Sequence, residues 1–219
     1  MKSKIKKLYQ NLKIYPEIKL GKHVNQSWHN DPKHLLFSLS RYKFVSKMLS
    51  GYSNVLEVGA GDGFQSRIVD NNVKKLDLCD VLEENKEYFK KNYYNKNKYY
   101  IHNFIDKKFT ITYNAIYSLD VIEHIKKKDF FKFLNNIKLS LKKNGILIVG
   151  TPNVTAFKYS NKFAKIEHIN NFTQKRLKNS LLKYFENVFI LGMNDEVMHT
   201  GFDEMCHYIF AICTDPKTK

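Results

Sequence analysis

Three glycines at alternate positions, directly after an apolar run, constrain this chain more than any other feature. The stretch VLEVGAGDG (55–63) places Gly59, Gly61 and Gly63 in one short turn, although the chain has only nine glycines. Glycine takes up positive φ angles without strain and lets a ligand approach the backbone closely. The stretch therefore predicts a buried strand over 54–59 that ends in a tight, ligand-facing turn.

Apolar runs that suit strands alternate with helical patterns along most of the chain, which is typical of a parallel sheet covered by helices on both faces. No helix separates the last two expected strands, so the final strand should be antiparallel, at or near an edge of the sheet. Strands are expected at 54–59, 74–81, 98–104, 113–120, 145–152, 187–192 and 205–213. Helices are expected at 31–50, 62–70, around 87–89, at 128–142 with Asn144-Gly145 as the C-cap, and at 173–185.

The composition is that of a globular protein, with 43% hydrophobic and 14% aromatic residues. No stretch approaches the roughly 18 apolar residues that a membrane span needs. The basic N-terminus lacks the apolar run and cleavage site of a secretory signal. We therefore expect a cytoplasmic protein without a membrane span.

The formal net charge of +16 raises the question of nucleic-acid binding. Of the 37 basic residues only Arg41, Arg67 and Arg176 are arginine, the side chain best suited to phosphates and guanine edges. The lysines are spread along the chain rather than clustered. This pattern argues against nucleic acid and favours attraction of a small anionic substrate.

Two acidic residues flank the glycine turn in the expected sheet. Glu57 lies within the first strand, where its carboxylate can face a cationic ligand, and Asp80 ends the second strand. An acid at the end of the second strand can accept hydrogen bonds from both hydroxyls of a ribose. A ligand with a ribose and a positive charge fits both acids, and S-adenosylmethionine has both.

At this point the sequence resembles the class I S-adenosylmethionine-dependent methyltransferases of the small-molecule branch. VLEVGAGDG resembles their first motif and LDLCDV (76–81) their second, and the likeness extends over YNAIYSLDVIEHI (113–125) and LKKNGILIVGTPN (141–153). It covers roughly residues 40 to 213. The resemblance implies a Rossmann-like α/β sheet of about seven strands with an antiparallel last strand.

The resemblance also implies how the chain is divided and which cofactor it uses. Residues 1–50 would form an N-terminal helical lid, and 51–219 a domain that binds S-adenosylmethionine and releases S-adenosylhomocysteine. A substrate-covering insertion is expected near 153–172. The family usually has an Asp after the third strand for the adenine amino group, and here Asn103 takes that place.

Twelve residues are candidate cofactor ligands. Phe104 is expected to pack on the adenine face, and Arg41 to meet the methionine carboxylate. The full set is Arg41, Glu57, Gly59, Ala60, Gly61, Gly63, Asp80, Val81, Asn103, Phe104, Leu119 and Asp120.

Methyl transfer to a hydroxyl or amine needs a positioned base, a task that suits histidine near neutral pH. The candidates are His168 in the insertion, His124 after the fourth strand, and His29 beside the only tryptophan, Trp28, which would exclude water as part of the lid. No acidic pair resembles a divalent-metal site of the catechol type, so no metal is expected.

The sequence thus predicts a methyltransferase, monomeric or homodimeric, that acts on a small polar or anionic metabolite. A bacterial capsule or other surface-polysaccharide precursor, methylated on a sugar hydroxyl or a phosphate-type group, is the expected class. Two alternatives stay open: an RNA or tRNA methyltransferase, suggested by the charge, and a catalytically inactive binding subunit of the same fold. The absence of an N-P-P-[YF] motif after the fourth strand weighs against nucleic-acid bases.

Overall fold

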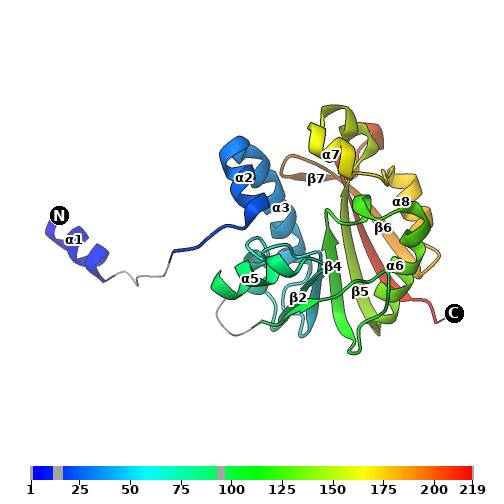
Figure 1. The fold of residues 1–219 in the computed structure, drawn as a ribbon, viewed down its shortest axis with the longest axis horizontal. Helices are drawn as coiled ribbons and strands as arrows, with labels where there is room; N and C mark the ends of the chain where they lie inside the picture. Colours follow the sequence, from blue (N-terminus) through cyan, green and yellow to red (C-terminus); the bar gives the residue numbers. More distant parts are fainter. Residues whose placement is uncertain (1, 12–16, 93–96, 219) are drawn as a thin grey trace.

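The structure, a computed structural model, describes residues 2–11, 17–92 and 97–218. Within them lies one eight-stranded sheet of order β3-β2-β1-β4-β5-β8-β6-β7 (Figure 1). The strands are Val55–Val58 (β1), Leu76–Asp80 (β2), Tyr99–Ile101 (β3), Tyr113–Leu119 (β4), Leu141–Pro152 (β5), Phe185–Asn194 (β6), Val197–His199 (β7) and Tyr208–Pro216 (β8).

The expected Rossmann-like sheet with an antiparallel last strand is confirmed. Strands β1 to β5 pair in parallel, and β8 runs antiparallel to both β5 and β6. The sheet has eight strands rather than about seven because the short β7 folds back on the end of β6. β7 thereby becomes the edge strand, and β8 lies inside the sheet between β5 and β6.

Helices cover both faces of the sheet. Apolar residues of α3, α4 and α5 pack on one face, and those of α6 and α8 on the other. In Figure 1 these two helical layers lie on opposite sides of the strands, and α1 stands apart from them. The α-helices are Lys2–Gln10 (α1), Lys22–Asn30 (α2), Pro32–Met48 (α3), Arg67–Asp70 (α4), Glu83–Asn92 (α5), Lys127–Leu139 (α6), Lys162–Glu167 (α7) and Gln174–Leu181 (α8).

The structure corrects the expected end of α6. The helix ends at Leu139, with Ser140 as its C-cap, and β5 begins at Leu141. The Ser140 hydroxyl donates to the Asn136 carbonyl at 2.8 Å, and the Ser140 carbonyl accepts from the amide of Tyr113 in β4 at 2.9 Å. Ser140 therefore joins helix to sheet, and Asn144-Gly145 lies inside β5, where the pairing with β4 shifts register.

Three other expected elements are shorter than predicted. The helix expected over 62–70 is reduced to α4, and Gly63, at φ +77°, lies outside helical backbone before it. The strand expected over 98–104 ends at Ile101, and the helix expected over 173–185 ends at Leu181.

The expected lid segment, 1–50, contains α1, α2 and α3, although residues 12–16 lie outside the described part of the chain. Asp31 caps α3, its side chain accepting from the His34 amide at 3.3 Å. The residues before Asp31 form a separate helix, α2. Among the described residues, no helix combines the length and the apolar character that crossing a bilayer requires.

Candidate functional site

The predicted site residues gather where the parallel strands end. The sheet order reverses between β1 and β4, because β1 leads on to β2 and β3 on one side while β4 leads to β5 on the other. In open α/β sheets, ligands bind outside the carboxyl ends of the strands at such a switch point. The glycine turn after β1, Asp80 at the end of β2 and Asp120 after β4 all lie there.

The glycines of the turn have different tasks. All three have positive φ, at +80° for Gly59, +55° for Gly61 and +77° for Gly63. A Cβ on Gly59 would lie 2.1 Å from Cγ2 of Val121, so this position must stay bare for the β1 and β4 ends to pack. A Cβ on Gly61 would meet no atom within 4 Å. Gly61 therefore faces open space, as expected of a glycine that contacts a ligand. We call this open space beside Gly61 the opening.

Asp80 is tied to the turn by backbone amides. Its Oδ2 accepts from the Gly61 amide and its Oδ1 from the Leu82 amide, both at 2.9 Å. The Tyr99 hydroxyl donates to the Gly61 carbonyl at 2.5 Å from β3. These bonds hold a half-buried carboxylate beside the opening, and each carboxylate oxygen keeps a further lone pair for a ligand hydroxyl.

Glu57, which was expected to face a cationic ligand, is buried between α3 and the sheet. Its carboxylate is 1% exposed and accepts from the hydroxyls of Tyr42, at 2.7 Å, and Tyr117, at 2.5 Å. Burial raises its pKa to about 7, against the lowering effect of the hydrogen bonds from Tyr117 and Tyr42. Glu57 therefore joins α3 to the centre of the sheet. The tyrosine pair was not predicted, because the sequence does not show which distant hydroxyls a buried strand carboxylate will meet.

Two predicted residues far apart in the sequence form an ion pair. Nη1 of Arg41, on α3, lies 2.9 and 2.8 Å from the two carboxylate oxygens of Asp120. The Arg41 guanidinium also lies 3.9 Å from the centroid of the Tyr208 ring. Asp120 has φ +55°, so the backbone turns sharply after β4 to present this carboxylate.

The two residues expected at the adenine lie in the loop after β3. Phe104 is 2% exposed and packs against Phe109 and Phe133 in the core, so its ring is covered in this structure. Asn103 is half-buried, and its Oδ1 accepts from the Ile105 amide at 2.9 Å within the loop after β3. An amide oxygen can accept a second hydrogen bond, so Asn103 keeps one place for a donor.

The remaining cofactor candidates differ in solvent exposure. Ala60, in the glycine turn, and Leu119, at the end of β4, are buried. Val81 is 59% exposed directly after Asp80. An exposed valine at this position gives the opening an apolar wall.

Two of the three predicted catalytic histidines meet. The rings of His124 and His168 lie edge to face, with centroids 5.0 Å apart. Burial lowers the pKa of His168, and the neighbouring His124 lowers it further. His29 instead lies on the exposed surface of α2 beside Trp28, which is 56% exposed rather than closed over a pocket.

Glu123 lies beside this pair and was not among the predicted site residues. It lies in the 3-10 turn Ile122–His124 (η1), is 1% exposed, and accepts from the Thr151 hydroxyl at 3.0 Å. Burial, followed by repulsion from Asp120, raises the pKa of its carboxyl to about 8. Three possible metal-ligand atoms, one from each of Glu123, His124 and His168, lie within 4.8 Å of one another. The sequence signal that could have pointed to Glu123 is an acidic residue that follows two apolar residues in DVIEHI (120–125).

The start of α2 contacts the glycine turn through Gly21, the N-cap of the helix. The Gly21 amide donates to Oδ2 of Asp62 at 2.5 Å, and the Lys22 ammonium lies 2.9 Å from the Glu84 carboxylate on α5. The Gln65 side-chain amide also donates to the Ser38 hydroxyl on α3 at 2.5 Å. The N-terminal segment is therefore anchored beside the opening at Gly61.

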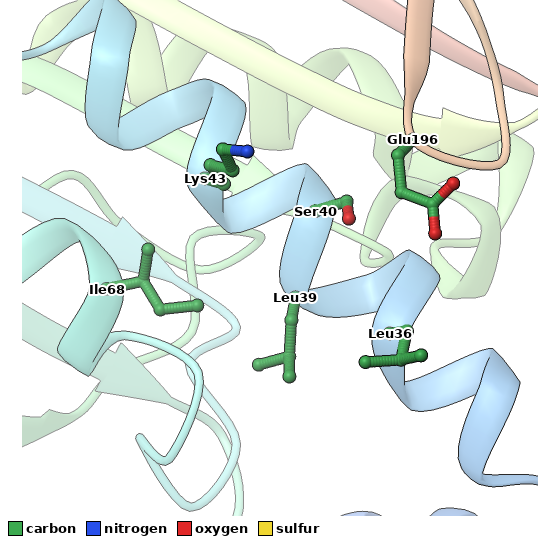
Figure 2. Close-up of a pocket in the computed structure, with 6 residues that line it drawn as sticks. All are labelled: Leu36, Leu39, Ser40, Lys43, Ile68 and Glu196. Carbon is green, nitrogen blue, oxygen red and sulfur yellow. The ribbon is translucent and has the colours of Figure 1, made fainter.

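A hollow of about 280 Å³ lies elsewhere, along the outer side of α3 between α4 and the β6–β7 turn (Figure 2). Its lining, all drawn in Figure 2, is Leu36, Leu39, Ser40, Lys43, Ile68 and Glu196. None of these residues ends a parallel strand, and the wall is mostly apolar and open. The strand-end residues, with their converging polar groups, are the better candidate site.

A family described as Methyltransferase domain matches residues 24–187. No curated protein matches the chain. Among solved structures, the chain is similar to the N-methyltransferase NodS from Bradyrhizobium japonicum WM9 in complex with S-adenosyl-L-homocysteine, with 14% identity and a TM-score of 0.61, over 90% of this chain and 98% of that chain.

Two further solved structures have similar folds. The plantazolicin methyltransferase BpumL in complex with S-adenosylhomocysteine has 14% identity and a TM-score of 0.64, over 88% of this chain and 94% of that one. The methyltransferase domain of bacterial CtHen1 has 16% identity and a TM-score of 0.66, over 81% of this chain and 98% of that one. At these identities the likeness establishes the fold.

Proposed function

The chain belongs to the methyltransferase-domain family, and from that premise we propose that it transfers the methyl group of S-adenosylmethionine to a small polar or anionic acceptor. A bacterial surface-polysaccharide precursor, with a sugar hydroxyl or a phosphate-type group as the acceptor, is the class we favour. The observation that carries the proposal is the position of two side-chain groups at one end of the sheet. Asp80 lies beside the opening at Gly61, and the His124–His168 pair lies just past β4.

The residues at the opening fit the cofactor. Gly61 leaves room that a side chain would fill, and Asp80 offers a fixed carboxylate for ribose hydroxyls. Val81 and Asn103 would flank the adenine, and the Arg41–Asp120 pair would meet the amino-acid end, where each charge has an opposite group to bind. When bound, S-adenosylmethionine supplies a methyl group activated by its sulfonium.

The acceptor end of the site is basic and carries the histidines. Lys158, Lys162 and Lys165 are exposed along the insertion that leads to His168. Their charges would draw an anionic acceptor to this side of the site. A histidine pair at the same place offers a neutral imidazole to accept the proton of a hydroxyl or amine, with His168 the first candidate and His124 the second.

The first test is cofactor binding to the full chain. At a hundredfold excess over its Kd, S-adenosylhomocysteine should stabilise the fold by about 2.7 kcal/mol, raising Tm by roughly 5–10 °C. Asp80→Ala should weaken that binding by about 1.5–3 kcal/mol, the scale of lost charge-assisted hydrogen bonds. Asp80→Asn, which keeps an acceptor oxygen, should lose less, and Glu186→Ala on β6 should lose nothing. A Tm unchanged by S-adenosylhomocysteine would remove the proposal.

The second test identifies the acceptor. The protein is incubated with methyl-labelled S-adenosylmethionine and a deproteinised extract of its own organism, and the labelled product is identified by mass spectrometry. Label in a sugar or sugar phosphate supports the proposal. Retention on RNA with a steep salt dependence would instead indicate an RNA methyltransferase. Cofactor binding without any labelled product would favour an inactive binding subunit.

A further inference from the structure

The cluster of Glu123, His124 and His168 brings three metal-ligating groups together from two distant segments. Glu123 and His124 lie in η1 after β4, and His168 follows α7 in the insertion. A carboxylate oxygen and one nitrogen of each imidazole all lie within 4.8 Å of one another. Glu123 is buried, His168 half-buried and His124 exposed, so the cluster has a closed inner wall and a side open to solvent.

Glu123 supplies an independent sign that a partner belongs here. Its Oε2 accepts from the Thr151 hydroxyl, but among the described residues its buried Oε1 has no hydrogen-bond partner. A buried carboxyl oxygen without a partner is costly unless a cation or a hydrogen-bond donor meets it. Arg41 on α3, whose positive charge acts on Glu123, is already bound to both carboxylate oxygens of Asp120.

We propose that Glu123, His124 and His168 bind a first-row divalent transition-metal ion. Two imidazoles and one carboxylate form the ligand set of catalytic zinc sites, which keep a fourth position open, whereas Mg²⁺ prefers oxygen ligands. Bonds of about 2.0–2.2 Å place tetrahedral ligand atoms about 3.3–3.5 Å apart. The three ligand atoms must therefore move closer together to bind an ion. Rotation of the exposed His124 side chain and of His168, at the end of α7, allows this movement.

The backbone holds the two segments of the site together. The Asn170 amide donates to the Glu123 carbonyl at 3.0 Å, and its side-chain amide donates to the Ile122 carbonyl at 3.3 Å. Arg176 in turn donates to the Asn170 side chain and to the Asn171 carbonyl. The loop that carries His168 is thus fixed to the turn that carries Glu123 and His124, so ligand binding needs side-chain movement alone.

The open position of the ion would take an oxygen of the acceptor. A divalent ion lowers the pKa of a bound hydroxyl, so it would perform the task otherwise given to an imidazole base, with the proton leaving to water. Binding of the ion does not depend on the proposed function, whereas its role toward the acceptor rests on it.

The test titrates the untagged, chelator-treated full chain with Co²⁺ and with Zn²⁺. We expect one ion per chain by calorimetry, visible absorption bands from Co²⁺ in a low-symmetry site, and displacement of Co²⁺ by Zn²⁺. Glu123→Gln and His168→Ala should each weaken binding at least a hundredfold. Two control variants should change the affinity for the ion less than threefold: Glu167→Gln, an exposed residue next to His168, and His34→Ala, an exposed residue on α3.

Controls separate the possible failures. If Glu123→Gln does not fold, His124→Ala, an exposed position, makes the same comparison. The Tm shift with S-adenosylhomocysteine is measured for every variant, because its presence without Co²⁺ binding overturns the metal site and leaves the proposed function standing. Binding of Co²⁺ that all four variants keep would also overturn the site, since the ion would then lie elsewhere.

Discussion

The glycine turn after β1 and the Glu123–His124–His168 cluster lie at the same end of the sheet but are built in opposite ways. The turn consists of consecutive residues, and its shape follows from three positive φ angles. The cluster joins η1 to a loop far along the chain through the bonds of Asn170. The proposed cofactor site is therefore encoded by consecutive residues, whereas the proposed acceptor site forms only once the insertion has folded against η1.

The largest expected effect separates the two regions by function. His168→Ala should lower turnover by about 10²–10⁴-fold, the range for losing a group that handles the acceptor's proton. Its affinity for S-adenosylhomocysteine, measured by calorimetry, should stay within a factor of about three, because the side chain lies in the insertion rather than at the turn. Full turnover in His168→Ala would place the chemistry elsewhere, with His29 the next residue to test. His34→Ala serves as the exposed control.

A smaller effect divides the turn itself. Gly59→Ala should destabilise the fold by about 2–5 kcal/mol, because its methyl group would meet Val121 and its φ of +80° strains an L-residue. Gly61→Ala, at φ +55° and facing open space, should cost only about 1 kcal/mol. Thermal unfolding of both variants without ligand tests this contrast. Equal losses would mean that packing, rather than ligand access, fixes both glycines.

The last expected effect is pH-dependent and concerns Glu57, the acid shared between the sheet and α3. Its raised pKa of about 7 means that between pH 4.5 and 7 the folded state binds more protons than the unfolded state. Stability contributed by Glu57 is therefore present at low pH and declines as pH rises through this window, by at most about 1.4 kcal/mol per unit. Glu57→Gln, uncharged throughout, should flatten the stability curve there.

Urea unfolding at several pH values measures that slope. Glu87→Gln, which removes an exposed carboxylate on α5, is the matched control and should leave the curve unchanged. A wild-type curve that already rises from pH 5 to 7, and that Glu57→Gln does not alter, would contradict the buried, largely protonated state of Glu57.

Much of the fold follows from local pattern. The apolar run before the glycines forms β1, all four of whose residues are buried, because a central parallel strand is covered on both faces. The absence of a helix between the last two strands predicted the antiparallel β8. The pattern could not show that β7 would form an edge and enclose β8, because a three-residue strand gains its stability from its partner rather than from its own sequence.

Single residues show the same division within the site. The sequence by itself determined the turn, Asp80 at the end of β2 and the strand-end position of Asp120, since glycine conformations and strand ends are local properties. Only the tertiary structure decided that Glu57 would bind two tyrosine hydroxyls, that Phe104 would enter the core, and that Glu123 would join two histidines. Those outcomes depend on which distant side chains share a buried space, and in low-dielectric surroundings a polar group's partners set its charge and its role.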